Sequence, residues 1–97
     1  MPGPRVMLEK DIERAVCDYA KAKGMLVYKF TSPARSAVPD RLLISRTGLI
    51  VFIEFKRPGA RPTPAQLREH DRLREQHATV YVVDDVTEGK RIVDWLL

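Results

Sequence analysis

Two short stretches of the chain carry residue types that suit metal-dependent chemistry: Pro39-Asp40 and Glu54-Phe55-Lys56. Glu54 is unusual because the five residues before it are all apolar. Its carboxylate is therefore expected to lie partly buried, where a charge needs a partner or a metal. Side chains alternate along a strand, which puts Glu54 and Lys56 on one face and Phe55 on the other. Taken alone, this pair is more simply explained as an ordinary ion pair at a strand end.

Asp40 changes this interpretation because of a predicted β-hairpin. Residues 41–45 and 49–56 are two apolar runs joined by a short turn that contains Gly48, a pattern typical of a hairpin. The turn brings the start of the first strand back to the end of the second, so Asp40 and Glu54 are expected to be neighbours. Two carboxylates without cysteine or histidine at ligand spacing suit Mg²⁺ or Mn²⁺ better than zinc. Pro-Asp is also a common turn before a strand, and the coincidence of both features favours a metal site.

The elements around these motifs predict a single α/β domain over residues 1–97, with residues 1–7 as a loose N-terminus. Periodicity and turn residues indicate three helices, at 8–23, 63–77 and 87–97, and four strands, at 25–30, 41–45, 49–56 and 79–84. This order predicts a four-stranded mixed sheet flanked by helices, with the hairpin partly central. The short C-terminal helix is expected to turn Leu96 and Leu97 inward.

Composition limits the class of protein and its partners. The 97 residues include 17 Lys and Arg against 13 Asp and Glu, for a net charge of +4. A basic chain suits a polyanionic partner such as nucleic acid, although charge alone is a weak argument. The single cysteine, Cys17, excludes an internal disulfide and fits a reducing cytoplasm. No apolar run approaches the roughly 20 residues of a membrane helix, and no signal peptide is apparent. We therefore expect a cytoplasmic protein with no membrane association.

The motifs, taken together, resemble those of the PD-(D/E)xK nuclease superfamily, and more closely those of the VRR-NUC family within it. Pro39-Asp40 and Glu54-Phe55-Lys56 are preceded by a helix with Glu9 and followed by Thr63-Pro64-Ala65-Gln66. A lone Glu-x-Lys is a weak signal, whereas four elements in order over residues 8–83 are fairly specific. The resemblance implies a restriction-endonuclease-like α-β-β-β-α-β core. It also implies an enzyme, a divalent-metal-dependent DNA endonuclease.

The resemblance further implies a role for each site residue. Asp40 and Glu54 would bind Mg²⁺ or Mn²⁺, with the backbone carbonyl of Phe55 as a further ligand. Lys56 would orient or activate the attacking water, or offset charge at the phosphate. A glutamate of the first helix would bind the metal directly or through water, and Gln66 would complete the site.

Two of these assignments stay open on the sequence. Glu9 falls about 60° from the centre of the apolar stripe of its helix and Glu13 about 100°. Glu9 can therefore reach a site at the edge of the core, and Glu13 is expected to face solvent. Glu9 is equally well explained as a favourable charge in the first helical turn. Thr63-x-x-Gln66 is a capping box, so Gln66 has a structural explanation as good as the catalytic one.

The partner implied by the resemblance is DNA. Arg35, Arg57 and Arg61 lie in loops beside the motifs and are expected to contact phosphates, whereas the arginines of residues 68–74 alternate with acids and are expected to form a solvated helix face. His70 is expected to be structural. Stand-alone family members resemble homodimeric nucleases that resolve four-way (Holliday) junctions, which implies branched DNA and DNA repair. A non-catalytic DNA-binding domain with a nuclease fold, or a restriction- or replication-type nuclease, remains an alternative.

Overall fold

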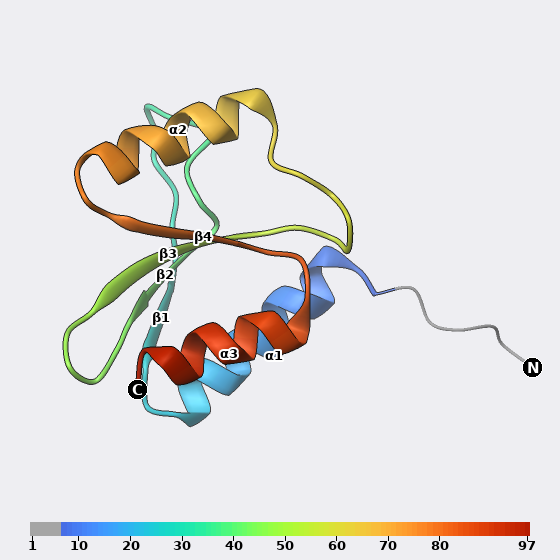
Figure 1. Cartoon of the computed structure of the whole chain (residues 1–97), viewed down its shortest axis with the longest axis vertical. Helices are drawn as coiled ribbons and strands as arrows, with labels where there is room; N and C mark the ends of the chain where they lie inside the picture. The colour runs from blue at the N-terminus through green and yellow to red at the C-terminus, as the bar shows by residue number, and fades with distance from the viewer. Residues whose placement is uncertain (1–6) are drawn as a thin grey trace, which may run out of the picture.

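The computed structural model describes residues 7–97 and shows a twisted sheet between two helical layers (Figure 1). The elements follow one another as α1 (Glu9–Ala22), β1 (Leu26–Lys29), β2 (Arg41–Ile44), β3 (Ile50–Phe55), α2 (Pro64–Glu75), β4 (Thr79–Val83) and α3 (Val86–Trp95). The predicted α-β-β-β-α-β core and the short C-terminal helix are confirmed, with bounds that differ by one or two residues. Residues 1–6 of the predicted loose N-terminus lie outside the described residues.

The four strands form one mixed sheet in the order β1-β2-β3-β4. β1, β2 and β3 are antiparallel neighbours, and β4 lies parallel to β3, because α2 carries the chain back across the sheet. The hairpin strands are central, as predicted. Gly48 has a φ of 89° in the hairpin turn, a backbone conformation that favours glycine. In the hairpin register Arg41 pairs with Ile53, so the next position outward, Asp40, comes opposite Glu54.

The main hydrophobic core lies on the face of the sheet that α1 and α3 cover (Figure 1). Ile53 and Phe55 of β3 are fully buried there. α1 and α3 approach closely, since a side chain at Gly89 would collide with Val16. Leu96 is buried as predicted, but Leu97 is 59% exposed. The inward prediction for Leu97 is wrong because α3 ends at Trp95 and the chain no longer follows the helical stripe.

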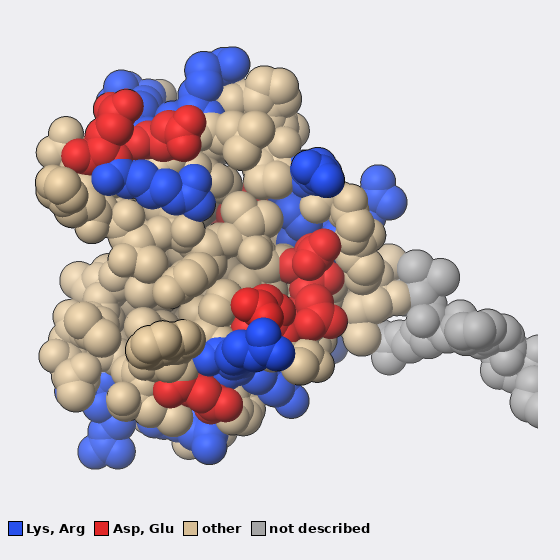
Figure 2. Space-filling view, in the orientation of Figure 1, with Lys and Arg blue, Asp and Glu red and all other residues tan. Residues whose placement is uncertain are grey.

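α2 packs on the opposite face, mainly against β4. Some apolar side chains of β1 and β3 on this face are not covered by α2. Leu26 is 53% exposed, Tyr28 51% and Ile50 52%. Figure 2 shows charged side chains over the two helical layers and, on the left of the view, an uncharged region between them. Among residues 7–97 there is no helix with the length and apolar character needed to cross a membrane.

Candidate active site

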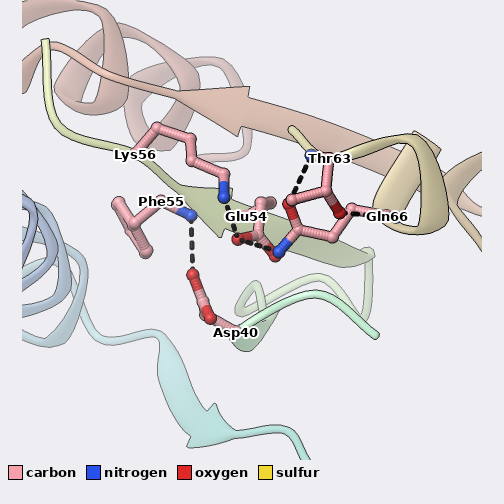
Figure 3. Close-up of polar contacts among 6 residues, drawn as sticks. All are labelled: Asp40, Glu54, Phe55, Lys56, Thr63 and Gln66. Carbon is pink, nitrogen blue, oxygen red and sulfur yellow. Dashed lines mark hydrogen bonds and ion pairs between the residues drawn. The ribbon is translucent and has the colours of Figure 1, made fainter. Parts of the chain in front are cut away.

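Asp40 lies where the loop after β1 enters β2, next to the end of β3 (Figure 3). Its Oδ2 atom accepts a hydrogen bond from the backbone N–H of Phe55 at 2.8 Å. Its own backbone carbonyl accepts from the N–H of Phe30 at 2.9 Å. Pro39 before it is fully buried. The backbone of Asp40 is therefore held by the residue after β1 and its carboxylate by β3, in the position that the predicted hairpin requires.

Glu54 is a buried carboxylate, 2% exposed, on the α2 face of β3. Its Oε2 atom accepts from Nε2 of Gln66 at 3.2 Å and lies 3.6 Å from Nζ of Lys56. Its Oε1 atom is also buried and has no hydrogen-bond partner within residues 7–97. Burial, and then the negative charge of Asp40, raise the pKa of Glu54 to about 7, while the nearby ammonium of Lys56 opposes the shift. The cationic surroundings of this carboxylate are thus insufficient to offset its burial.

A divalent cation fits these two carboxylates. It would supply the positive charge that the pair lacks, and Oε1 of Glu54 is free to coordinate it. Within the described chain no group of three or more acidic, histidine or cysteine side chains is placed to hold a metal. A site with two carboxylates suits Mg²⁺, which keeps several waters and takes further ligands from substrate phosphate. The backbone carbonyl of Phe55 stays a predicted ligand.

Gln66 takes part in both the helix cap and the site, at the N-terminal end of α2 (Figure 3). Oγ1 of Thr63 accepts from the N–H of Gln66 at 3.2 Å, and Oε1 of Gln66 accepts from the N–H of Thr63 at 2.9 Å. The amide nitrogen of the same side chain donates to Glu54 at 3.2 Å. The two explanations that the sequence left open are therefore compatible, because the amide has an acceptor and a donor and uses both.

Glu13 of α1 is not solvent-facing, contrary to the sequence prediction. Its Oε2 atom lies 2.6 Å from Nε of Arg41, and each of the two side chains is 24% exposed. The ion pair shows that Arg41 points to the face of the sheet that α1 covers. The prediction failed because the fully buried stripe of α1 includes Cys17 and Ala20, which brings Glu13 to the edge of the packed face.

Glu9 is exposed at the first position of α1. Its side chain has no hydrogen bond or ion pair to any other residue of the described range. Ile12 and Pro58 line one hollow, so the start of α1 lies near the loop that follows Lys56. A role for Glu9 at the metal, direct or through water, stays a prediction.

The three predicted DNA-contacting arginines are all at the surface. Arg57 and Arg61 are exposed in the loop between β3 and α2. Arg35 instead donates from Nη1 to Glu69 of α2 at 3.0 Å. His70 is fully buried, and neither ring nitrogen has a partner within residues 7–97. Burial lowers the pKa of His70 and so favours its neutral ring; a structural role for this histidine stays a prediction.

Comparison with known proteins finds a curated relative and solved structures that share the fold. No family model matches the chain. A protein of Acyrthosiphon pisum secondary endosymbiont phage 1, named "Putative nuclease p44", is 45% identical over 80 residues, which cover 82% of this chain and 86% of the relative. A solved structure described as a VRR_NUC domain is 34% identical, with a TM-score of 0.82 over 89% of this chain and 94% of its own. A VRR_NUC domain protein with 15% identity, a TM-score of 0.75 and coverage of 95% and 89% supports the fold alone.

The metal-free protein is expected to lose stability as the pH rises from 4.5 to about 7. Between the ordinary pKa of 4.5 and the folded value of about 7, the folded state binds more protons than the unfolded state, so raising the pH favours unfolding. The side chain in Glu54→Gln is neutral at every pH. The free energy of unfolding of this variant should exceed that of the wild type by about 2–3 kcal/mol above pH 7, and the difference should vanish in acid. Urea unfolding in EDTA measures this, with Glu75→Gln on exposed α2 surface as the control. Parallel pH profiles for wild type and Glu54→Gln would contradict the assignment.

The cap and the site role of Gln66 should separate in a pair of variants. Thr63→Ala removes only a cap acceptor and is expected to cost about 1 kcal/mol without altering the pH dependence. Gln66→Ala should cost a similar amount and also move the transition of Glu54 to higher pH, because the carboxylate loses an amide donor. The same unfolding series, in EDTA, measures both effects. If the two variants give identical pH profiles, Gln66 acts only as a cap.

Proposed function

Because the chain belongs to the VRR-NUC family of the PD-(D/E)xK nuclease superfamily, we propose that it is a divalent-metal-dependent endonuclease that hydrolyses phosphodiester bonds of DNA. The observation that carries this proposal is the pair of neighbouring carboxylates formed by the buried Glu54 and the partly buried Asp40. Within residues 7–97 one oxygen of Glu54 has no hydrogen-bond partner, and burial raises the pKa of Glu54 to about 7. A protein that keeps such a group in its interior, beside a second carboxylate, has a site suited to a cation.

The residues around the pair have distinct roles in the proposed reaction. Asp40 and Glu54 hold Mg²⁺ or Mn²⁺, which when bound polarises the scissile phosphodiester and lowers the pKa of bound water. Gln66 fixes Oε2 of Glu54, so that Oε1 remains available to the cation. Lys56 lies on the same face, 3.6 Å from Glu54, where its ammonium orients or activates the attacking water or offsets charge at the phosphate. Glu9 adds a ligand, directly or through water.

The proposed substrate is DNA. The net charge of +4 favours a polyanion. Arg57 and Arg61 are exposed in the loop directly after Lys56, where they suit contacts to phosphates that position a strand without reading its sequence. The proposed place of action is the cytoplasm. Cys17 is buried, and burial raises the pKa of its thiol to about 11, so we propose no role for it in the reaction.

The finer part of the proposal is a homodimer that acts on branched DNA such as four-way junctions, in DNA repair. A two-fold symmetric pair presents one site to each of two strands. Trp95 and Leu97, 80% and 59% exposed at the end of α3, give an apolar surface that suits a second copy of the chain, since identical apolar patches need no charge matching.

Cleavage of a panel of linear, flapped and four-way DNA tests the activity. The wild type is expected to cut in Mg²⁺ or Mn²⁺ and not in EDTA, with four-way DNA cut fastest. Asp40→Asn, Glu54→Gln and Lys56→Met should each lower the rate by at least about 100-fold, whereas Glu75→Gln should leave it unchanged. Binding without cleavage of any substrate would instead support the non-catalytic alternative.

The molar mass in solution tests the homodimer. Light scattering at micromolar concentration is expected to give twice the mass of 11.1 kDa, and Trp95→Ser with Leu97→Ser should shift the protein toward monomer. Thr87→Ser, on the exposed surface of α3, is the matched control. A wild-type protein that stays monomeric with and without four-way DNA would exclude the homodimer.

A further inference from the structure

A hollow of about 360 Å³ lies between α2 and the loop that precedes Asp40. Its wall contains Arg35 and Ser36 from the loop, Arg68 and Arg72 from α2, and also Glu69 and three alanines. We call it the basic hollow. Arg35 and Ser36 also line a neighbouring hollow that reaches Asp40. The two hollows share these two residues, so the basic hollow adjoins the hollow that Asp40 lines.

The basic hollow has a net positive charge. Three guanidinium groups and one carboxylate line it, which leaves two positive charges. The carboxylate belongs to Glu69, whose side chain is only 9% exposed. It lies 3.0 Å from Nη1 of Arg35 and 3.5 Å from Nε of Arg72. Glu69 therefore fixes two arginines from different segments and is itself largely hidden from the hollow's solvent side.

The arginines of the basic hollow have N–H donors that are not used in contacts within the protein. The side chain of Arg68 is exposed and has no hydrogen bond or ion pair with any residue between 7 and 97. A guanidinium has five N–H donors. Arg35 donates one of them to Glu69, and Arg72 forms only an ion pair with Glu69, at 3.5 Å. The alanines leave room in front of these groups. Planar guanidinium donors at an open position suit phosphate oxygens, to which arginine binds in a bidentate manner.

We propose that the basic hollow binds an internal phosphodiester of the DNA strand that enters the active site, displaced along the strand from the scissile one. Arg68 and Arg72 donate to the phosphate, and Arg35, anchored by Glu69, completes the positive wall. This inference rests on the proposed nuclease function and adds a second contact point on the same strand. With the scissile phosphate at the metal site and a second phosphate in the basic hollow, the direction in which the strand crosses Asp40 and Glu54 is determined. The arginines that alternate with acids along α2 are thus a binding surface and not only a solvated helix face.

Binding in EDTA, where no cleavage occurs, tests the proposal. The variant Arg68→Gln/Arg72→Gln is compared with Arg91→Gln, a control on α3 whose side chain is 67% exposed. The double variant is expected to bind duplex and four-way DNA about tenfold more weakly, and its plot of log affinity against log salt should be shallower by about two. Arg68→Lys/Arg72→Lys keeps both charges and should recover part of the loss. Circular dichroism and urea unfolding check that each variant is folded.

Neutral methylphosphonate linkages, placed one at a time along the strand, locate the contact. For wild type, one linkage away from the cut site is expected to lower affinity by about the same tenfold factor, and in Arg68→Gln/Arg72→Gln the same linkage should have no further effect. In Mn²⁺ the double variant should show a raised KM with a nearly unchanged kcat. Substrates with a 5′-phosphate or a 5′-hydroxyl separate an internal phosphate from a terminal one, and a loss seen only with the 5′-phosphate would overturn the internal assignment.

The failure of this inference is distinguishable from failure of the proposed function. If Arg68→Gln/Arg72→Gln matches Arg91→Gln in affinity and salt dependence, while Mn²⁺-dependent cleavage persists and Asp40→Asn abolishes it, the basic hollow is not a phosphate site and the nuclease stands. If wild type neither binds nor cuts DNA, both are wrong.

Discussion

In the β2–β3 hairpin, Arg41 pairs with Ile53, and this register brings Asp40 opposite Glu54. The candidate site depends on it, because a slip of one residue would turn every side chain of β3 to the other face. Glu54 would then lie in the core that α1 and α3 cover, and Phe55 would be exposed toward α2. Burial of Ile53 and Phe55 on the core face therefore fixes the side on which the carboxylate appears. The hydrophobic core specifies the site without contributing an atom to its chemistry.

The start of α2 joins the helix to this hairpin. Thr63 and Gln66 cap the helix reciprocally, and the same glutamine donates to Glu54. A helix that begins one residue earlier or later would turn the amide away from the carboxylate, since each residue rotates the helix by about 100°. The cap that sets the first turn of α2 also sets the direction of the side chain that orients Glu54.

The electrostatics of the site oppose folding and favour a ligand. Glu54 is buried beside Asp40, with Lys56 as its nearby cation, and its pKa is raised to about 7. At neutral pH the protein without a cation therefore holds a carboxylate that would ionise more readily in the unfolded chain. Such local conflict with the rest of the fold is typical of functional sites. The ion pair of Arg35 with Glu69 joins the loop before Asp40 to α2. The basic hollow lies between these two segments, on the α2 face of the sheet.

The sequence by itself determined the elements, their order and the neighbourhood of Asp40 and Glu54. These features follow from periodicity, turn residues and hairpin geometry, which are local properties that a short window of sequence contains. Only the tertiary structure decided how α1 and α2 are rotated against the sheet. That rotation placed Glu13 against Arg41 and not in solvent, allowed Gln66 to serve as cap and site donor together, and opened the basic hollow beside the loop. A helical stripe predicts which face is buried to within about one residue, and one residue is a rotation of about 100°. Packing against a partner segment removes this ambiguity, and the partner is distant in sequence.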